Sequence, residues 1–187
     1  AGTDNGDGTW TLEAGDLEGL TVTPPADSDG DFQLNVTATS ADGSDTESVS
    51  GTVNVSVDPD ADTPVLKVSD ASGTEDQPIE LDIASGLTDT DGSESLSITI
   101  SDVPDGASLS AGTDNGDGTW TLEAGDLEGL TVTPPADSDG DFQLNVTATS
   151  ADGSDTESVS GSINVSVDPD ADAPVLKVSD ASGTEDQ

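Results

Sequence analysis

The chain has 187 residues and carries 41 acidic side chains against two lysines, which gives a formal net charge of −39. This charge excludes nucleic acid and anionic membrane surfaces as electrostatic partners and favours cations, although a merely solubilising acidic surface would look the same. The chain has no cysteine and no histidine, which excludes disulfides, thiolate chemistry and the usual nitrogen ligands of zinc or copper. The side chains that remain available as metal ligands bind through oxygen, which suits hard cations.

The sequence repeats itself with a period of 110 residues. Residues 1–77 return as residues 111–187 with three changes, Thr52 to Ser162, Val53 to Ile163 and Thr63 to Ala173. Such spacing indicates tandem copies of one domain-sized unit, which is typical of structural arrays and disfavours an enzyme. Proline and aspartate follow the last apolar alternation at residues 57–64 and 167–174, where we place linkers. Residues 63–172 then form a complete domain. Residues 1–62 are the back part of a preceding domain, and residues 173–187 are the opening strand of a following one.

Strict alternation of apolar and polar residues predicts the strands. Gly, Pro, Asn, Asp and Ser clusters separate them, and no segment of useful length has the helical period. We therefore expect an all-β fold, an immunoglobulin-like or cadherin-like sandwich of seven antiparallel strands repeated in tandem. The alternating runs lie within residues 79–83, 96–100, 120–122, 130–132, 142–148 and 163–167, and the run at residues 65–68 is added as the seventh strand.

Residues 1–62 lack the first strands of this sandwich. Half of their apolar face and their sheet edges would be open, which is unfavourable unless something covers them. We expect the gap to be filled by another molecule or by a separate piece of the same array.

Carboxylates gather in the linkers with the spacing that calcium requires. Calcium takes six to eight oxygens, and carboxylates at i, i+2 and i+4 of an irregular segment can turn toward one ion. Without an ion, adjacent like charges would repel one another and extend the linker. These predicted ligands are Asp58, Asp60, Asp62, Asp168, Asp170 and Asp172.

Two further acidic motifs are candidate ligand loops. GTEDQ follows the first predicted strand and contributes Glu75 and Asp76, with copies at Glu185 and Asp186. DTDGSE places three acids around a glycine, like a compressed calcium loop. These three acids are Asp89, Asp91 and Glu94. We expect both motifs at the same end of the sandwich, if the second strand runs antiparallel to the first.

Other acidic runs have simpler interpretations. TDNGDG, at Asp4 and Asp114, is first of all hairpin-turn chemistry, because Asn-Gly and Asp-Gly supply positive φ. DSDGD, beginning at Asp27, has alternating spacing and is either a turn or a metal loop. ADGSD, with Asp42 and Asp45, is expected to be a plain loop.

Several motifs in order resemble a known family: GTEDQPI, LTDTDGSESLSI, VPDGASLS, NGDGTWTL and the DxDxxP-type linker. Over the whole period the chain is similar to the cadherin-like, VCBS-type repeats in the extender regions of giant bacterial repeats-in-toxin (RTX) adhesins. The resemblance implies type I secretion to the outside of a Gram-negative cell, an immunoglobulin-like fold, and calcium at domain junctions that stiffens a stalk for cell adhesion and biofilm formation. It also implies that Glu75, Asp76, Asp89, Asp91 and Glu94 act beside the linker aspartates Asp58, Asp60 and Asp62.

We therefore expect a non-enzymatic spacer whose partners are Ca²⁺ and neighbouring repeats, with magnesium or sodium left open at the looser sites. The alternative is a tandem carbohydrate- or ligand-binding module of a secreted protein, which would gain avidity from repetition. Such modules usually present exposed aromatic platforms. Here the Trp and Phe of each repeat alternate with polar residues, as core positions do.

Overall fold

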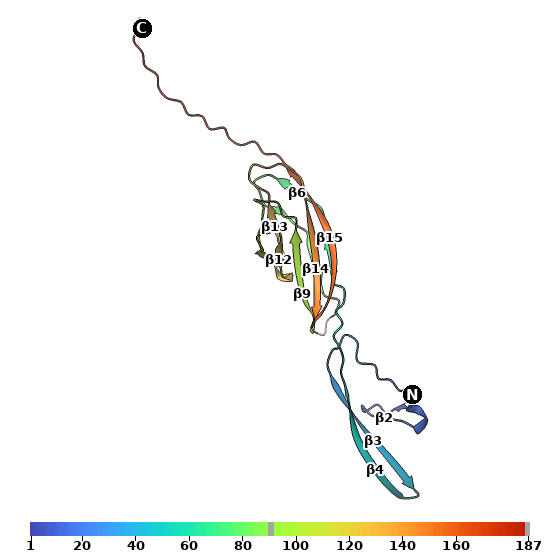
Figure 1. The fold of residues 1–187 in the computed structure, drawn as a ribbon. Coiled ribbons are helices and arrows are strands. Elements are labelled where there is room, and N and C mark those ends of the chain that lie inside the picture. The colour runs from blue at the N-terminus through green and yellow to red at the C-terminus, as the bar shows by residue number, and fades with distance from the viewer. Residues whose placement is uncertain (90–91, 186–187) are drawn as a thin grey trace.

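The computed structural model describes residues 1–89 and 92–185 and is all-β. It contains strands, loops and two single 3₁₀ turns, η1 (Ala14–Asp16) and η2 (Ala124–Asp126). No helix among these residues has the length and apolar character needed to cross a membrane. Two units lie end to end, and the C-terminal residues extend from the far end of the second one (Figure 1).

The second unit contains every run predicted to be a strand. The run 79–83 is split in two, and β6, β10 and β11 are additional, so the described part of this unit has more strands than the predicted seven. These strands are β5 Val65–Val68, β6 Ala71–Thr74, β7 Ile79–Glu80, β8 Ile83–Gly86, β9 Ser95–Ser101, β10 Ser108–Leu109, β11 Thr113–Asp114, β12 Trp120–Leu122, β13 Thr131–Thr133, β14 Phe142–Asp152 and β15 Asp155–Asp168.

The strands of this unit form one large sheet and two small ones. The six-stranded sheet has the order β11-β12-β9-β14-β15-β6, and the smaller sheets are β10-β13-β7 and β5-β8. The pairs are antiparallel except β6 with β15, which is parallel and corrects the prediction of a purely antiparallel fold. No hairpin joins these two strands, so turn geometry does not dictate their direction.

One hydrophobic core joins the large sheet to the small ones. It includes Leu144 and Val146 of β14, which are fully buried, and Ile79 and Val132 of the three-stranded sheet. Polar residues between the buried positions of β14 are partly exposed, as the period of two predicts. Trp120 packs against this core from β12.

The first unit has the same sequence as residues 111–172 of the second except at Thr52 and Val53, but it has no such core. It consists of β1 (Thr3–Asp4) paired with β2 (Trp10–Thr11) and β3 (Phe32–Asp42) paired with β4 (Asp45–Val55). No residue from 1 to 60 is buried. Its apolar face is bare in the single chain.

Candidate metal centre

Two acidic clusters lie at opposite ends of the second unit. Ser95 pairs with Ala151, so the residues before β9 and after β14 meet where the linker from the first unit enters. Thr74 pairs with Asp168, so the residues after β6 and β15 meet at the other end. The entry cluster consists of Asp62, Asp89, Glu94, Asp152 and Asp155. The exit cluster consists of Glu75, Asp76, Asp137, Asp170 and Asp172.

At the entry cluster, the backbone of the incoming linker is fixed by the second unit. The N–H of Asp62 donates to Oε1 of Glu94, and the carbonyl of Asp62 accepts a hydrogen bond from the Ser150 hydroxyl. The N–H of Ala61 donates to Oδ2 of Asp155 at 2.9 Å. Ala61 itself is buried, so the end of the linker is part of the folded unit.

Glu94 is the most informative side chain of the entry cluster. It is only 9% exposed, and its second oxygen, Oε2, is buried without a hydrogen-bond partner in the described structure. A buried carboxylate oxygen without a partner is costly unless it receives a proton or a cation. Asp89 and Asp152, which are 7% and 5% exposed, are buried beside the same linker.

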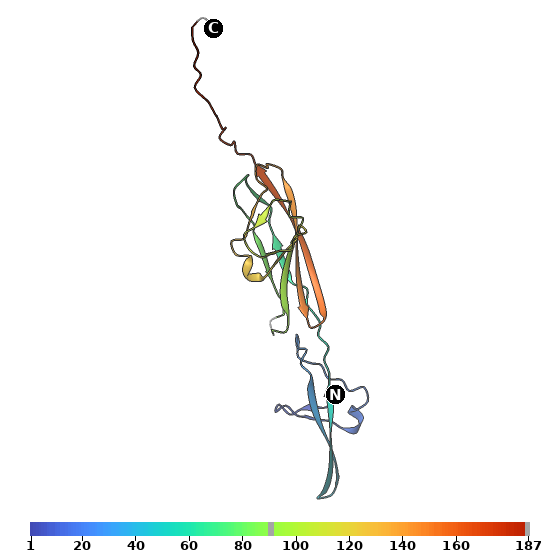
Figure 2. The same cartoon turned by 60° about the vertical axis from the view of Figure 1, so that its left-hand side comes forward.

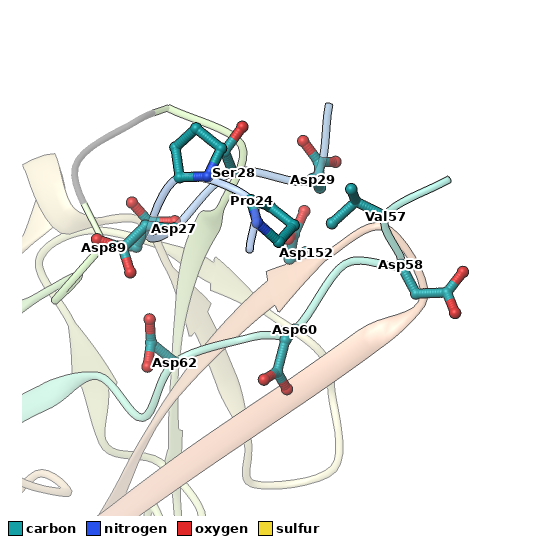
Figure 3. A pocket seen from close by; sticks show the side chains of 11 residues that line it. Pro24, Asp27, Ser28, Asp29, Val57, Asp58, Asp60, Asp62, Asp89 and Asp152 are labelled. Carbon is teal, nitrogen blue, oxygen red and sulfur yellow. The ribbon is translucent and has the colours of Figure 1, made fainter. Parts of the chain in front are cut away.

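A hollow of about 310 Å³ lies at this junction and is lined from both units. Asp27 and Asp29 approach it from the first unit, and Asp89 and Asp152 from the second (Figure 3). All four side chains carry carboxylates, so the hollow is suited to a hard cation.

The three predicted linker ligands, Asp58, Asp60 and Asp62, all line this hollow, but they are not among the described carboxylates whose oxygens lie within 4.8 Å of one another. Asp62 lies on the side of Asp27 and Asp89, whereas Asp58 points away from them (Figure 3). The reason is that alternate residues of an extended segment are about 6.6 Å apart, too far for three successive carboxylates to meet around one ion. Calcium binding at Asp58, Asp60 and Asp62 stays a prediction.

At the exit cluster, three carboxylates come close enough to share an ion. Oxygens of Asp76, Asp137 and Asp172 lie within 4.8 Å of one another, and all three side chains are exposed. The N–H of Asp137 donates to Oδ1 of Asp76 at 3.1 Å. Both residues have positive φ, 60° for Asp76 and 55° for Asp137, which aspartate tolerates better than most side chains.

The proximity of these carboxylates changes the titration of Asp172. A hydrogen bond between its carboxyl group and that of Asp137 raises the pKa of Asp172, and the negative charges of Asp137 and Asp76 raise it further. A divalent cation would remove this repulsion by replacing the shared proton.

Glu75 fixes the outgoing linker as Glu94 fixes the incoming one. Glu75 is 8% exposed, its N–H donates to the carbonyl of Asp168 at 3.0 Å, and its Oε1 accepts from the N–H of Asp170 at 2.7 Å. Two buried glutamates, one at each end, thus hold linker backbone.

The expectation that GTEDQ and DTDGSE share one end is wrong. The chain does not turn back after β5. It continues toward the exit end as β6, which joins the large sheet beside β15. Glu75 therefore reaches the exit end, while β8 returns along β5 and brings Asp89 and Glu94 to the entry end. Glu75 and Asp76 accompany the linker of Asp168, Asp170 and Asp172, not that of Asp58, Asp60 and Asp62.

Some predicted ligands are not placed in a cluster. Asp91 and Asp186 lie outside the described residues. Glu185 is exposed in the extended C-terminal segment.

Sequence reasoning missed several residues of the clusters. Asp137 is the copy of Asp27 in DSDGD, whose alternating acids left the metal-loop interpretation open. Asp152 and Asp155 are the copies of Asp42 and Asp45 in ADGSD, which was expected to be a plain loop. This loop is the β14–β15 hairpin at the entry end, and no local pattern shows that a linker docks on it.

The turn interpretation of TDNGDG agrees with the structure. Oδ1 of Asp114 accepts the N–H of Gly116 at 2.8 Å, and the N–H of Asn115 donates to the carbonyl of Thr119 at 3.0 Å. Hydrogen bonds from the hydroxyl and N–H of Thr119 lower the pKa of Asp117, the other acid of this turn. The carboxylates are thus engaged in local turn contacts.

Comparison with known proteins adds little. No family model and no curated protein matches the chain. Among solved structures, it is similar to an endo-fucoidan hydrolase of glycoside hydrolase family 107, with 19% identity and a TM-score of 0.29. The match covers 79% of this chain and 20% of the hydrolase, so the chain spans a fifth of that protein's length. At this TM-score, the similarity carries no argument about fold or activity.

Proposed function

We propose that the chain is a set of calcium-rigidified spacer repeats from the extender of a secreted bacterial cell-surface adhesin, each complete repeat being an immunoglobulin-like or cadherin-like β-sandwich. The repeats would hold a ligand-binding tip away from the cell. The observation that carries the proposal is the buried oxygen of Glu94, which has no hydrogen-bond partner in the described structure. The other oxygen of Glu94 accepts from the N–H of Asp62, and Asp62 lines a hollow together with carboxylates of both successive units.

The linker contacts support a stiff joint. At the exit end, Glu75 holds the N–H of Asp170, whose copy is Asp60. At the entry end, the second unit holds the next two residues, Ala61 and Asp62. Applied to every joint of an array, these two sets of contacts would engage three consecutive linker residues, the first with the preceding repeat and the other two with the following one. No freely rotating linker residue would then separate the preceding repeat from the following one.

Carboxylates from both sides of such a joint would repel one another, and calcium would turn this repulsion into attraction. The complete ligand set of a joint would combine the exit-type acids of one repeat with the entry-type acids of the next. Extracellular modules need only weak sites, with dissociation constants on the order of 0.1–1 mM. Bound ions would also stabilise the folded repeats by mass action.

The alternative of a carbohydrate-binding module has no specific support from the second unit. Its tryptophan, Trp120, packs against the core and offers no exposed aromatic platform.

Thermal melting and small-angle X-ray scattering with 5 mM calcium or with EDTA test the proposal. Calcium should raise the melting temperature and narrow the distribution of interunit angles. Because a chain of charge −39 binds cations unspecifically, magnesium at the same ionic strength is the control. Equal melting curves and equal scattering curves in calcium, magnesium and EDTA would refute a calcium-dependent joint.

A further inference from the structure

The chain enters and leaves the second unit through strands that run in the same direction. It passes from the incoming linker into β5 and β6, and it leaves through β15. β6 pairs with β15 in parallel, and both run toward the exit end. In both views the entry and exit ends lie far apart, and β14 and β15 extend along the line between them (Figures 1 and 2). Tension on the two linkers therefore pulls β6 back toward the entry end and β15 onward past the exit end.

The direction of pairing decides how two strands resist such tension. Opposite forces along a parallel pair slide one strand past the other, so all hydrogen bonds between them must stretch together. Forces that separate two strands from one end break the bonds one after another, each under the full force. An antiparallel pair would bring both linkers to one end and would open in this second way. The parallel pairing of β6 with β15 produces the more resistant case.

Hydrogen bonds close the paired segment at both ends. Residues 71–74 pair with residues 165–168. Just before this segment, Oδ1 of Asp70 accepts the backbone N–H of Asn164 at 2.9 Å and its side-chain N–H at 3.0 Å. Just after it, the N–H of Glu75 donates to the carbonyl of Asp168 at 3.0 Å. Sliding β6 along β15 therefore breaks these contacts together with the ladder.

Packing opposes the same movement. A Cβ added at Gly73 would lie 2.5 Å from Cγ1 of Ile79, and one added at Gly161 would lie 2.9 Å from Cγ2 of Val68. The entering strands thus lie tightly against β7 and β15 at two glycines. Sliding β5 and β6 by two residues would bring larger side chains opposite Ile79 and Val68, because every second residue of a strand faces the same side.

We propose that β6 and β15 form a mechanical clamp, which lets the complete repeat withstand tension along the chain without a bound ion. The clamp consists of the paired residues 71–74 and 165–168 together with the contacts of Asp70 and Glu75 at its ends. The proposal deepens the proposed function, since a spacer that holds a tip away from the cell carries tension. It is independent of calcium, because every contact of the clamp joins two parts of the protein.

Single-molecule force spectroscopy in EDTA tests the clamp separately from the calcium-dependent joint. Pulling the chain from its two termini loads β6 and β15 lengthwise. The chain has no cysteine, so Gln77→Cys provides a unique second attachment point at an exposed residue that follows β6. Pulling from this cysteine and the C-terminus separates the same two strands from their exit ends. The second unit should unfold at a force several times higher in the first geometry than in the second.

The unfolding of the second unit can be recognised by its length. When the termini are pulled, the event should lengthen the chain by about 300–400 Å, because each unfolded residue spans at most about 3.6 Å. Such an event reports the rate of unfolding under force.

Asp70→Ala tests the contacts of the clamp. The substitution removes both hydrogen bonds to Asn164, so under constant force the variant should unfold roughly tenfold faster than the wild type. Asp180→Ala is the matched control, because Asp180 is the copy of Asp70 and is exposed in the C-terminal segment. This control should unfold at the wild-type rate.

A core variant distinguishes mechanical resistance from ordinary stability. Ile98 is fully buried in β9, and β14 separates this strand from β15. Ile98→Ala should lower the midpoint of urea denaturation more than Asp70→Ala does, but it should accelerate unfolding under force less. Equal unfolding forces in the two pulling geometries, or an Asp70→Ala variant that unfolds under force at the wild-type rate, would overturn the proposal.

Discussion

Oε1 of the Glu94 side chain accepts a hydrogen bond from the backbone N–H of Asp62. Oε2 of the same side chain is buried without a hydrogen-bond partner in the described structure. The contact fixes where the first unit is attached, because Asp62 belongs to the linker. The same carboxylate is thus both an anchor for the linker backbone and the best candidate for an ion ligand. These two roles can be separated experimentally.

The first prediction concerns Glu94→Gln. The amide keeps an acceptor for the N–H of Asp62 but removes the buried charge, so in EDTA the variant should be more stable than the wild type by about 1–3 kcal/mol. In calcium the order should reverse, because the variant loses a charged ligand. Urea denaturation in both buffers measures this crossover. Glu128→Gln, which removes an exposed charge, should show no crossover.

A second prediction concerns Asp172→Asn at the exit cluster. Because the pKa of Asp172 is raised in the folded chain, this group favours the folded state below its unfolded pKa, and that contribution is lost as the pH rises through its folded pKa. Without calcium, the variant should therefore lose less stability than the wild type between pH 4 and pH 7. Urea denaturation across this range measures the difference. Asp139→Asn, outside the triad, should leave the pH profile of the wild type unchanged, and a parallel change in both variants would contradict the assignment.

A third prediction compares the two copies of one leucine. Leu144 is fully buried and Leu34 is 38% exposed, although their neighbours in the sequence are the same. Leu144→Ala should lower the free energy of unfolding by about 2–5 kcal/mol, since it leaves a cavity. Leu34→Ala should lower it by less than about 0.5 kcal/mol. Chemical denaturation of dilute protein measures both. Comparable losses would mean that the first unit has a core in solution.

A fourth prediction compares two copies of one glycine. A Cβ at Gly73 would lie 2.5 Å from Cγ1 of the buried Ile79, whereas a Cβ at Gly183 meets nothing within 4 Å. Gly73→Ala should therefore cost about 1–3 kcal/mol through overpacking. Gly183→Ala should leave the melting temperature of dilute protein unchanged. A stable Gly73→Ala variant would show that β6 can move away from β7.

Much of the fold follows from local alternation. Leu96 to Ile100 and Phe142 to Ala148 are strands because every second side chain is apolar, and this pattern suits only an extended segment with one buried face. β6 was not predicted, because Ala71 to Thr74 contains no large apolar residue. Its strand character comes from backbone pairing with β15.

The candidate site, like the fold, was predictable from the sequence only in part. The sequence by itself determined that carboxylates are concentrated in loops and linkers, that strands alternate, and that the unit is repeated, because each of these is a property of neighbouring residues. Tertiary structure alone decided that Glu75 and Glu94 lie at opposite ends, that Asp137 joins Asp76 and Asp172, and that one copy of a residue is buried while the other is exposed. Burial and ligand geometry depend on which distant strands pair, and two identical segments with different partners must differ in both.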